Sequence, residues 1–215
     1  MQKAKLKAEK LTIIDRLDED YSVTVKKKGE QTFFIFLTDD KSQSGEIKIL
    51  MDAKDIKIQI LGIILGSGKN IISLTTLQDH IASTSVSNLF IKSILFDEAK
   101  LNYEGIIRIR KNAQKSNAYQ KNQNIIMSEK AWVNTRPSLE ILADDVRCTH
   151  GATIGKIDQN QLYYLSTRGL SRNQSTRLIL AGFYREVLDR IPDNKIKQKL
   201  VTIVERKLDK ILKIS

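Results

Sequence analysis

Residues 55–65, DIKIQILGIIL, decide the fold class, because apolar and polar side chains alternate there with a period of two over most of the stretch. This alternation is typical of a β-strand, whose successive side chains point to opposite faces. The stretch is also the most apolar one in the chain, but Lys57 and Gln59 interrupt it, so it does not predict a membrane-spanning helix. The start of the chain, MQKAKLKAEKL, lacks the apolar region of a signal peptide, and we therefore expect a cytoplasmic protein.

Toward the N-terminus, strand patterns also occur in residues 46–50 (EIKIL), 31–37 (QTFFIFL) and 21–25 (YSVTV). The last two flank the segment KKKGE, which contains Gly29, and together they predict a β-hairpin. Residues 1–20 predict a short N-terminal segment with a weak helix, whose apolar stripe would consist of Leu6, Leu11, Ile14 and Leu17.

Toward the C-terminus, a series of short apolar runs continues the strand pattern, and their starts lie 15 to 19 residues apart. The runs are residues 71–74, 89–95, 105–109, 124–127 and 139–142. Evenly spaced short strands with few turn residues indicate the stacked coils of a parallel β-helix, here over residues 21–156. A β-sandwich is the alternative, because the spacing alone does not exclude it.

The pattern becomes helical near residue 158, which predicts a C-terminal helical domain over residues 157–215. Asp158 and Ser171 are expected to cap the first two helices, since each is followed three residues later by glutamine. Pro192 should end the second helix, and Asp193 could cap a third. The apolar stripe of that third helix would consist of Ile196, Leu200, Ile203, Val204, Leu208 and Ile211.

The charge of the chain is strongly basic, with 36 Lys and Arg against 25 Asp and Glu, a formal net charge of +11. Residues 100–136 alone carry +6, which favours an acidic or polyanionic partner. A basic, β-rich nucleic-acid-binding protein is therefore an alternative function, although only Tyr103, Tyr119 and Trp132 could stack on bases there. A β-helix enzyme acting on polysaccharide is a further alternative, and it would need a charged cluster on one outer face.

The chain contains one cysteine, Cys148, which excludes an internal disulfide and a cluster held by four of its own thiolates. His150 lies two residues further on, so in a strand the thiol and the imidazole share one face and could both bind a metal. The alternative is a half-buried cysteine beside a structural histidine, because two ligands do not make a metal site. Iron–sulfur chemistry on this chain would need ligands from elsewhere.

Several motifs together resemble the C-terminal core of the SufB/SufD family: residues 117–120 (NAYQ), 122–128 (NQNIIMS), 137–141 (PSLEI), 143–155 (ADDVRCTHGATIG) and 161–165 (QLYYL). The resemblance implies a right-handed parallel β-helix followed by helices, in a non-enzymatic scaffold that assembles iron–sulfur clusters. Within the family the chain looks SufD-like, since His150 falls on the histidine tied to cluster formation. SufB-type members have a glutamate in place of Gly151 and a cysteine near Lys121.

The resemblance also implies partners. The β-helix would pair with a SufB-type or an identical chain, and a transient iron–sulfur cluster at that interface would use His150 and Cys148. The helices of residues 157–215 would bind the SufC ATPase. The candidate docking residues are Leu162, Tyr163, Tyr164, Leu165, Arg168 and Phe183. The chain is shorter than usual members, which implies a reduced N-terminal domain and fewer coils.

Overall fold

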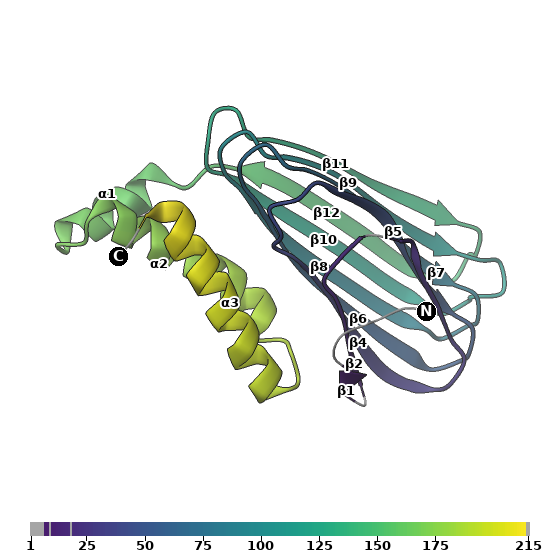
Figure 1. Cartoon of the computed structure of the whole chain (residues 1–215). Coiled ribbons are helices and arrows are strands. Elements are labelled where there is room, and N and C mark those ends of the chain that lie inside the picture. Colours follow the sequence, from purple (N-terminus) through teal and green to yellow (C-terminus); the bar gives the residue numbers. More distant parts are fainter. Residues whose placement is uncertain (1–6, 9, 18, 214–215) are drawn as a thin grey trace.

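The computed structural model describes residues 7–8, 10–17 and 19–213. In that part of the chain, twelve strands are followed by three helices (Figure 1). The strands are β1 (Lys7–Ala8), β2 (Leu11–Ile14), β3 (Tyr21–Val25), β4 (Gly29–Leu37), β5 (Gln43–Met51), β6 (Ile56–Gly66), β7 (Ile71–His80), β8 (Val86–Leu95), β9 (Lys100–Ile109), β10 (Asn117–Ile126), β11 (Trp132–Ile141) and β12 (Arg147–Gly155). Each apolar run found in the sequence lies within one strand or ends just beyond it.

The strands form two sheets, with the orders β1-β2-β4-β6-β8-β10-β12 and β11-β9-β7-β5-β3. All described neighbours are parallel except β1 and β2. From β3 onward, successive strands alternate between the two sheets, so the chain coils into a β-solenoid of about five turns. The predicted parallel β-helix is confirmed, and the β-sandwich alternative is wrong because parallel neighbours require crossover connections.

Two predictions at the N-terminal end are wrong. β3 and β4 do not form a hairpin, because β3 pairs with β5 whereas β4 lies in the other sheet between β2 and β6. The predicted N-terminal helix is also absent from the described residues: Leu11–Ile14 is a strand, and Leu6 lies outside the described part. Pairing with β4 and burial of Leu11 override the helical spacing of these apolar residues.

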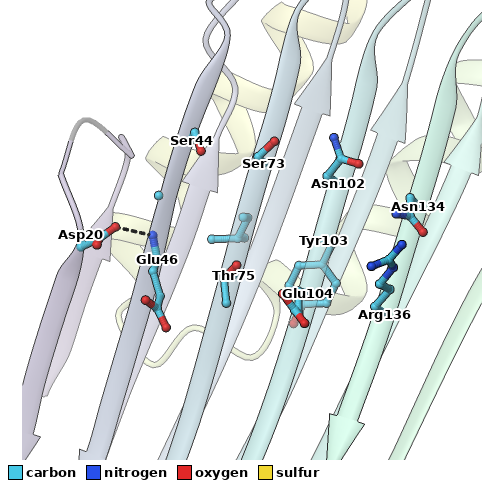
Figure 2. A pocket seen from close by; sticks show the side chains of 12 residues that line it. Asp20, Ser44, Glu46, Ser73, Thr75, Asn102, Tyr103, Glu104, Asn134 and Arg136 are labelled. Carbon is cyan, nitrogen blue, oxygen red and sulfur yellow. Dashed lines mark hydrogen bonds between the residues drawn. The ribbon is translucent and has the colours of Figure 1, made fainter.

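The outer face of the five-stranded sheet carries rows of polar side chains, one from each successive strand (Figure 2). One row consists of Ser44, Ser73, Asn102 and Asn134, and the next row consists of Glu46, Thr75, Glu104 and Arg136. An open groove of about 470 Å³ runs over these rows. Asp20 borders this groove, and its Oδ1 accepts a hydrogen bond of 2.9 Å from the Glu46 amide of β5.

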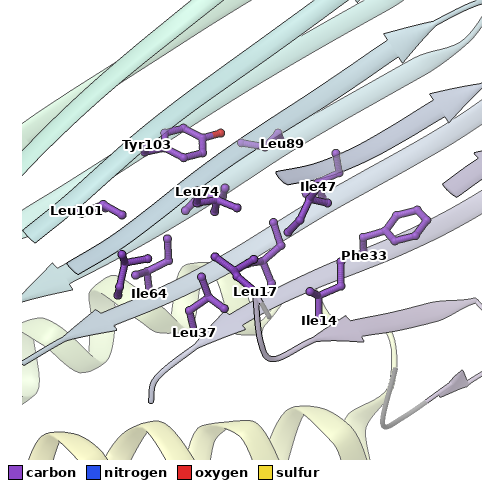
Figure 3. Close-up of a cluster of buried hydrophobic side chains, with 14 of the residues drawn as sticks. Ile14, Leu17, Phe33, Leu37, Ile47, Ile64, Leu74, Leu89, Leu101 and Tyr103 are labelled. Atoms are coloured by element: carbon purple, nitrogen blue, oxygen red, sulfur yellow. The ribbon is translucent and has the colours of Figure 1, made fainter. Parts of the chain in front are cut away.

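The inner faces of both sheets meet in an apolar core that fills most of the solenoid (Figure 3). Residues 33–37 (FFIFL) of β4 form a continuous apolar run. Phe33 and Ile35 point into this core, while Phe34 and Phe36 point outward. The outward pair is covered by the helices, so both faces of the strand are buried. Continuous apolar runs of this kind are typical of parallel strands covered on both sides.

Hydrogen bonds between successive coils tie the corners of the solenoid together. Asp97 accepts a hydrogen bond of 2.8 Å from the Gly68 amide, and its own amide donates to Ser128 at 2.8 Å. At other corners, Asp55 and Thr84 both have a positive φ, and the Thr84 hydroxyl donates to Asp55 at 2.9 Å. The corners therefore stack in register like the strands.

The helices are α1 (Gln159–Thr167), α2 (Arg172–Leu188) and α3 (Asn194–Leu212), and their predicted caps are confirmed. Ser171 and Gln174 form a capping box, and Asp158 and Asp193 accept hydrogen bonds from their helix starts. The helices pack on the outer face of the seven-stranded sheet, where α2 contacts β6 and β8 (Figure 1). In the described residues, none of the helices is long and apolar enough to cross a membrane.

Candidate functional site

The last coil leaves the C-terminal end of the solenoid open. β12 ends one sheet and pairs with β10, and β11 ends the other sheet and pairs with β9. Within the described chain, the outer edges of both strands have no strand beside them. Their unpaired amides and carbonyls can form further ladder hydrogen bonds with another chain.

Cys148 and His150 lie on this edge strand, and their side chains share the inward face. Their register partners on β10 are Ala118 and Gln120, both of which are 1% exposed inside the solenoid. His150 is exposed and Cys148 is partly buried, because no further coil covers them. The structure thus places the thiol and the imidazole on one face, as the two-residue spacing predicts, and at the open end of the interior.

Apolar side chains surround this open end. Cys148 packs with Leu139 and Val146 against the buried Ile107 and Ile109. Larger apolar side chains remain exposed on the last coil and just beyond it: Trp132 (47%), Ile141 (41%), Leu142 (66%) and Ile154 (47%). Exposed apolar side chains spread along unpaired strand edges are typical of a surface that another protein covers.

The Cys148 thiol is not activated by its surroundings. Partial burial raises the pKa of Cys148 above its ordinary value. A cysteine that serves as a nucleophile usually has a lowered pKa, because the thiolate is the reactive form. Cys148 is therefore protonated at neutral pH.

Below His150, the interior of the solenoid is polar. Gln120 donates a 3.3 Å hydrogen bond to the Gly105 carbonyl and accepts one of 3.4 Å from the Gln78 amide. A Cβ at Gly105 would lie 2.1 Å from the Gln120 Nε2, so only glycine leaves room for this amide. Sequence reasoning missed Gln120 and Gln78, although Gln120, Asn122 and Asn124, at every second position of β10, were a signal of a polar inner row.

His80 lies in the same interior and is fully bonded. Its Nδ1 is 2.7 Å from the Ser85 Oγ, and its Nε2 is 2.8 Å from the Ser87 Oγ. Burial lowers the pKa of His80 to about 4, so the imidazole is neutral at physiological pH. His80 thus has a structural role, and it does not join Cys148 and His150.

The candidate docking residues divide into exposed and buried groups. Tyr163 and Tyr164 on α1 are 73% and 57% exposed, and Arg168 stacks its guanidinium 5.3 Å from the Tyr164 ring. Leu162 is only 8% exposed and belongs to the core, where it cannot contact a partner directly.

Two further members of the predicted set are half-buried: Leu165, and Phe183, whose ring lies 4.2 Å from the Lys92 Nζ. The sequence interpretation missed Leu178 of α2, which is 52% exposed. The exposed apolar surface of the helices therefore excludes Leu162, which was predicted to belong to it, and includes Leu178, which was not.

The basic stretch of residues 100–136 does not form a continuous free patch. Arg110 makes two hydrogen bonds of 3.0 and 2.8 Å to the buried Asp79, and Arg108 bonds Glu140 at 2.6 Å. Lys130 bonds Glu98 at 3.2 Å. Three of the eight basic residues in this stretch are therefore paired with carboxylates of neighbouring coils, which weakens the nucleic-acid alternative.

The fold defines a class: a parallel β-solenoid with C-terminal helices, whose last coil places a thiol and an imidazole on a strand edge that is unpaired in the described chain. The comparisons with known proteins agree. Residues 19–183 match the family model described as "SUF system FeS cluster assembly, SufBD core domain". That match covers more than half of the chain, and the chain belongs to this SufBD family of iron–sulfur cluster assembly proteins.

Curated relatives support the SufD-like assignment. The chain is 35% identical over 117 residues to the iron–sulfur cluster assembly protein SufD of Escherichia coli (54% of this chain, 28% of the relative). It is 34% identical over 146 residues to SufD of Bacillus subtilis (68% and 33%) and 37% identical over 114 residues to a SufBD family protein of Synechocystis (53% and 25%). The matched segment thus spans a third or less of each of these relatives.

Proposed function

We propose that this chain is a SufD-type scaffold subunit that holds a nascent iron–sulfur cluster between itself and a partner chain. The observation that carries the proposal is the position of Cys148 and His150 on the inward face of the edge strand β12, at the open end of the solenoid. The cluster is cargo, and the subunit performs no catalysis of its own.

The ligand count supports a shared site. Iron–sulfur clusters are usually held by four cysteines, with histidine replacing some of them in certain proteins. This chain has one cysteine, so Cys148 and His150 can supply at most part of a ligand set. A SufB-type or identical chain pairing with β12 would supply the rest, and it would also cover Ile141 and Ile154.

The two candidate ligands differ in whether a proton must leave before they bind iron. His150 binds iron as a neutral imidazole and needs no proton displaced when it is unprotonated. Cys148 must lose a proton for which burial has raised the pKa. We therefore assign the larger part of cluster retention to His150, and a weaker or structural part to Cys148.

The helices would dock the SufC ATPase. Tyr163, Tyr164 and Leu178 supply exposed apolar surface on α1 and α2, and aromatic side chains of this kind are common anchors in protein interfaces. Leu162 is buried and supports this surface from below, while the half-buried Leu165 and Phe183 and the exposed Arg168 remain candidate contacts.

Anaerobic reconstitution tests the proposal. The chain would be mixed with a SufB-type chain and SufC from the same organism, and complex formation followed by light scattering. Ferrous iron and sulfide would then be added, and cluster formation followed by its visible absorption. We expect a complex that forms a cluster, and loss of most of that absorption with His150→Ala.

Thr149→Ala is the matched control, because Thr149 is exposed on the same strand but faces the opposite side. It should leave the absorption unchanged. Failure of the chain to associate with either partner, or a normal cluster yield with His150→Ala, would contradict the proposal.

A further inference from the structure

The charged side chains of α3 divide into those that are paired within the molecule and those that are not. Both acidic residues of the helix are bonded to α2: Glu205 accepts from Arg185 at 3.2 Å, and Asp209 accepts from Arg177. Two of its lysines are also paired, Lys207 with Asp40 and Lys197 with Asp189. The acidic side chains of α3 are thus used within the molecule.

The remaining cations form what we call the cationic stripe: Lys195, Lys199, Arg206, Lys210 and, at the C-cap, Lys213. All of them are exposed, and in the described part of the chain none lies within ion-pair distance of a carboxylate. At 3.6 residues per turn they fall within an arc of about 60° and extend over about 27 Å. The buried Leu200, Val204 and Leu208 lie on the opposite side of the helix.

The composition of this surface selects the kind of partner. The apolar side of α3 is already buried, so it offers little to insert into a lipid surface. The helix has no aromatic side chain on which a nucleic-acid base could stack. An acidic protein surface needs neither, because facing charges accelerate association and set its salt dependence.

We infer that the cationic stripe steers an acidic surface of the ATPase partner onto the helices. The inference rests on the proposed function and adds the chemistry of the partner's docking surface. Leu178 lies on α2, whose Arg177 and Arg185 bond α3, so the exposed apolar surface and the stripe belong to one layer of helices. The apolar surface holds the partner, and the stripe raises the rate at which it arrives.

Association kinetics with SufC from the same organism, measured over a range of salt concentrations, tests this inference. The stripe variant carries Lys199→Glu, Arg206→Glu and Lys210→Glu. The control variant carries Lys27→Glu, Lys54→Glu and Lys111→Glu, which make the same charge change on exposed corners of the solenoid. At low salt we expect the stripe variant to associate at least about tenfold more slowly, with a flatter salt dependence and a similar dissociation rate.

The control variant should change the association rate much less. Equal slowing by both variants, or no slowing by either, would overturn the steering role of the cationic stripe and leave the proposed docking of SufC intact. Absence of any binding by the unaltered chain would overturn the docking proposal and the inference together. Stripe-dependent binding of duplex DNA or of anionic phospholipid vesicles, tighter than that of SufC at the same salt, would reassign the stripe to a phosphate-bearing partner.

Discussion

Single buried residues set the conditions under which this solenoid is stable. His80 is neutral in the folded protein, because burial lowers its pKa to about 4, whereas an unfolded histidine titrates near 6.5. The unfolded chain therefore binds a proton that the folded protein does not, between these two pH values. Stability must fall as the pH drops through this window.

We expect the free energy of unfolding to be about 2 kcal/mol lower at pH 5 than at pH 7 on account of His80. Urea unfolding at the two pH values measures this difference. His80→Asn should lower stability at pH 7 and remove most of the pH dependence, since asparagine does not titrate. The other histidine, His150, is exposed, so His150→Ala should keep the pH dependence; a His80→Asn protein that keeps it as well would contradict this explanation.

At the residue scale, the sequence predicted that Cys148 and His150 share a face, because a strand has a period of two. It did not show which face. That depends on the register with β10, where Ala118 and Gln120 point inward. The register is fixed by contacts between residues about 30 positions apart, and no local pattern contains them.

At the scale of elements, the contact between β8 and α2 contains a buried charge. Lys92 is 4% exposed, lies 4.2 Å from the Phe183 ring and bonds Glu186 of α2 at 2.5 Å. Burial lowers the pKa of Lys92, and Glu186 opposes that shift. A buried ammonium that loses its only carboxylate partner destabilises a protein more than the pair stabilises it.

Glu186→Gln should therefore lower the free energy of unfolding by about 1–3 kcal/mol. The double variant Lys92→Met with Glu186→Gln should regain most of this loss, because methionine fills a similar space without a charge. Urea unfolding of both single variants and the double variant gives the coupling energy. Additive effects would show that the pair does not hold α2 to the sheet.

At the same scale, the sequence predicted where the strands lie better than it predicted which strands pair. Alternation and short apolar runs located most strands from β3 onward, and the caps at Asp158, Ser171 and Asp193 located the helices. KKKGE looked like a hairpin turn because a corner between two sheets uses the same small and charged residues as a turn within one sheet. The N-terminal segment looked helical because Leu11, Ile14 and Leu17 are three residues apart. In the structure Leu11 and Ile14 face opposite sides of β2, and both sides are buried.

At the scale of the whole molecule, the open end is the surface on which assembly should depend. Ile154 on β12 and Leu142 just beyond β11 are 47% and 66% exposed there. A charge at these positions would prevent a partner strand from closing over the end of the core. The same charge costs the isolated subunit little, because both side chains are in contact with water.

Leu142→Asp combined with Ile154→Lys should weaken association with the SufB-type or identical chain at least about tenfold, as seen by light scattering. The free energy of unfolding of the isolated chain should change by less than about 1 kcal/mol. Ile71→Lys is the matched control, since Ile71 is 45% exposed on β7, a central strand, and should leave association unchanged. Unchanged association in the double variant would place the interface elsewhere.

The constant register of the coils has a consequence for how such a chain can vary. From the β3–β5 pair onward, register partners lie between 26 and 32 residues apart along the chain, and each coil repeats the same inward and outward rows. A deletion or duplication of one whole coil would join strands of matching register and preserve the last coil with Cys148 and His150. Length in this architecture is therefore a modular quantity, which genetic change can adjust one coil at a time without rebuilding the end that meets the partner.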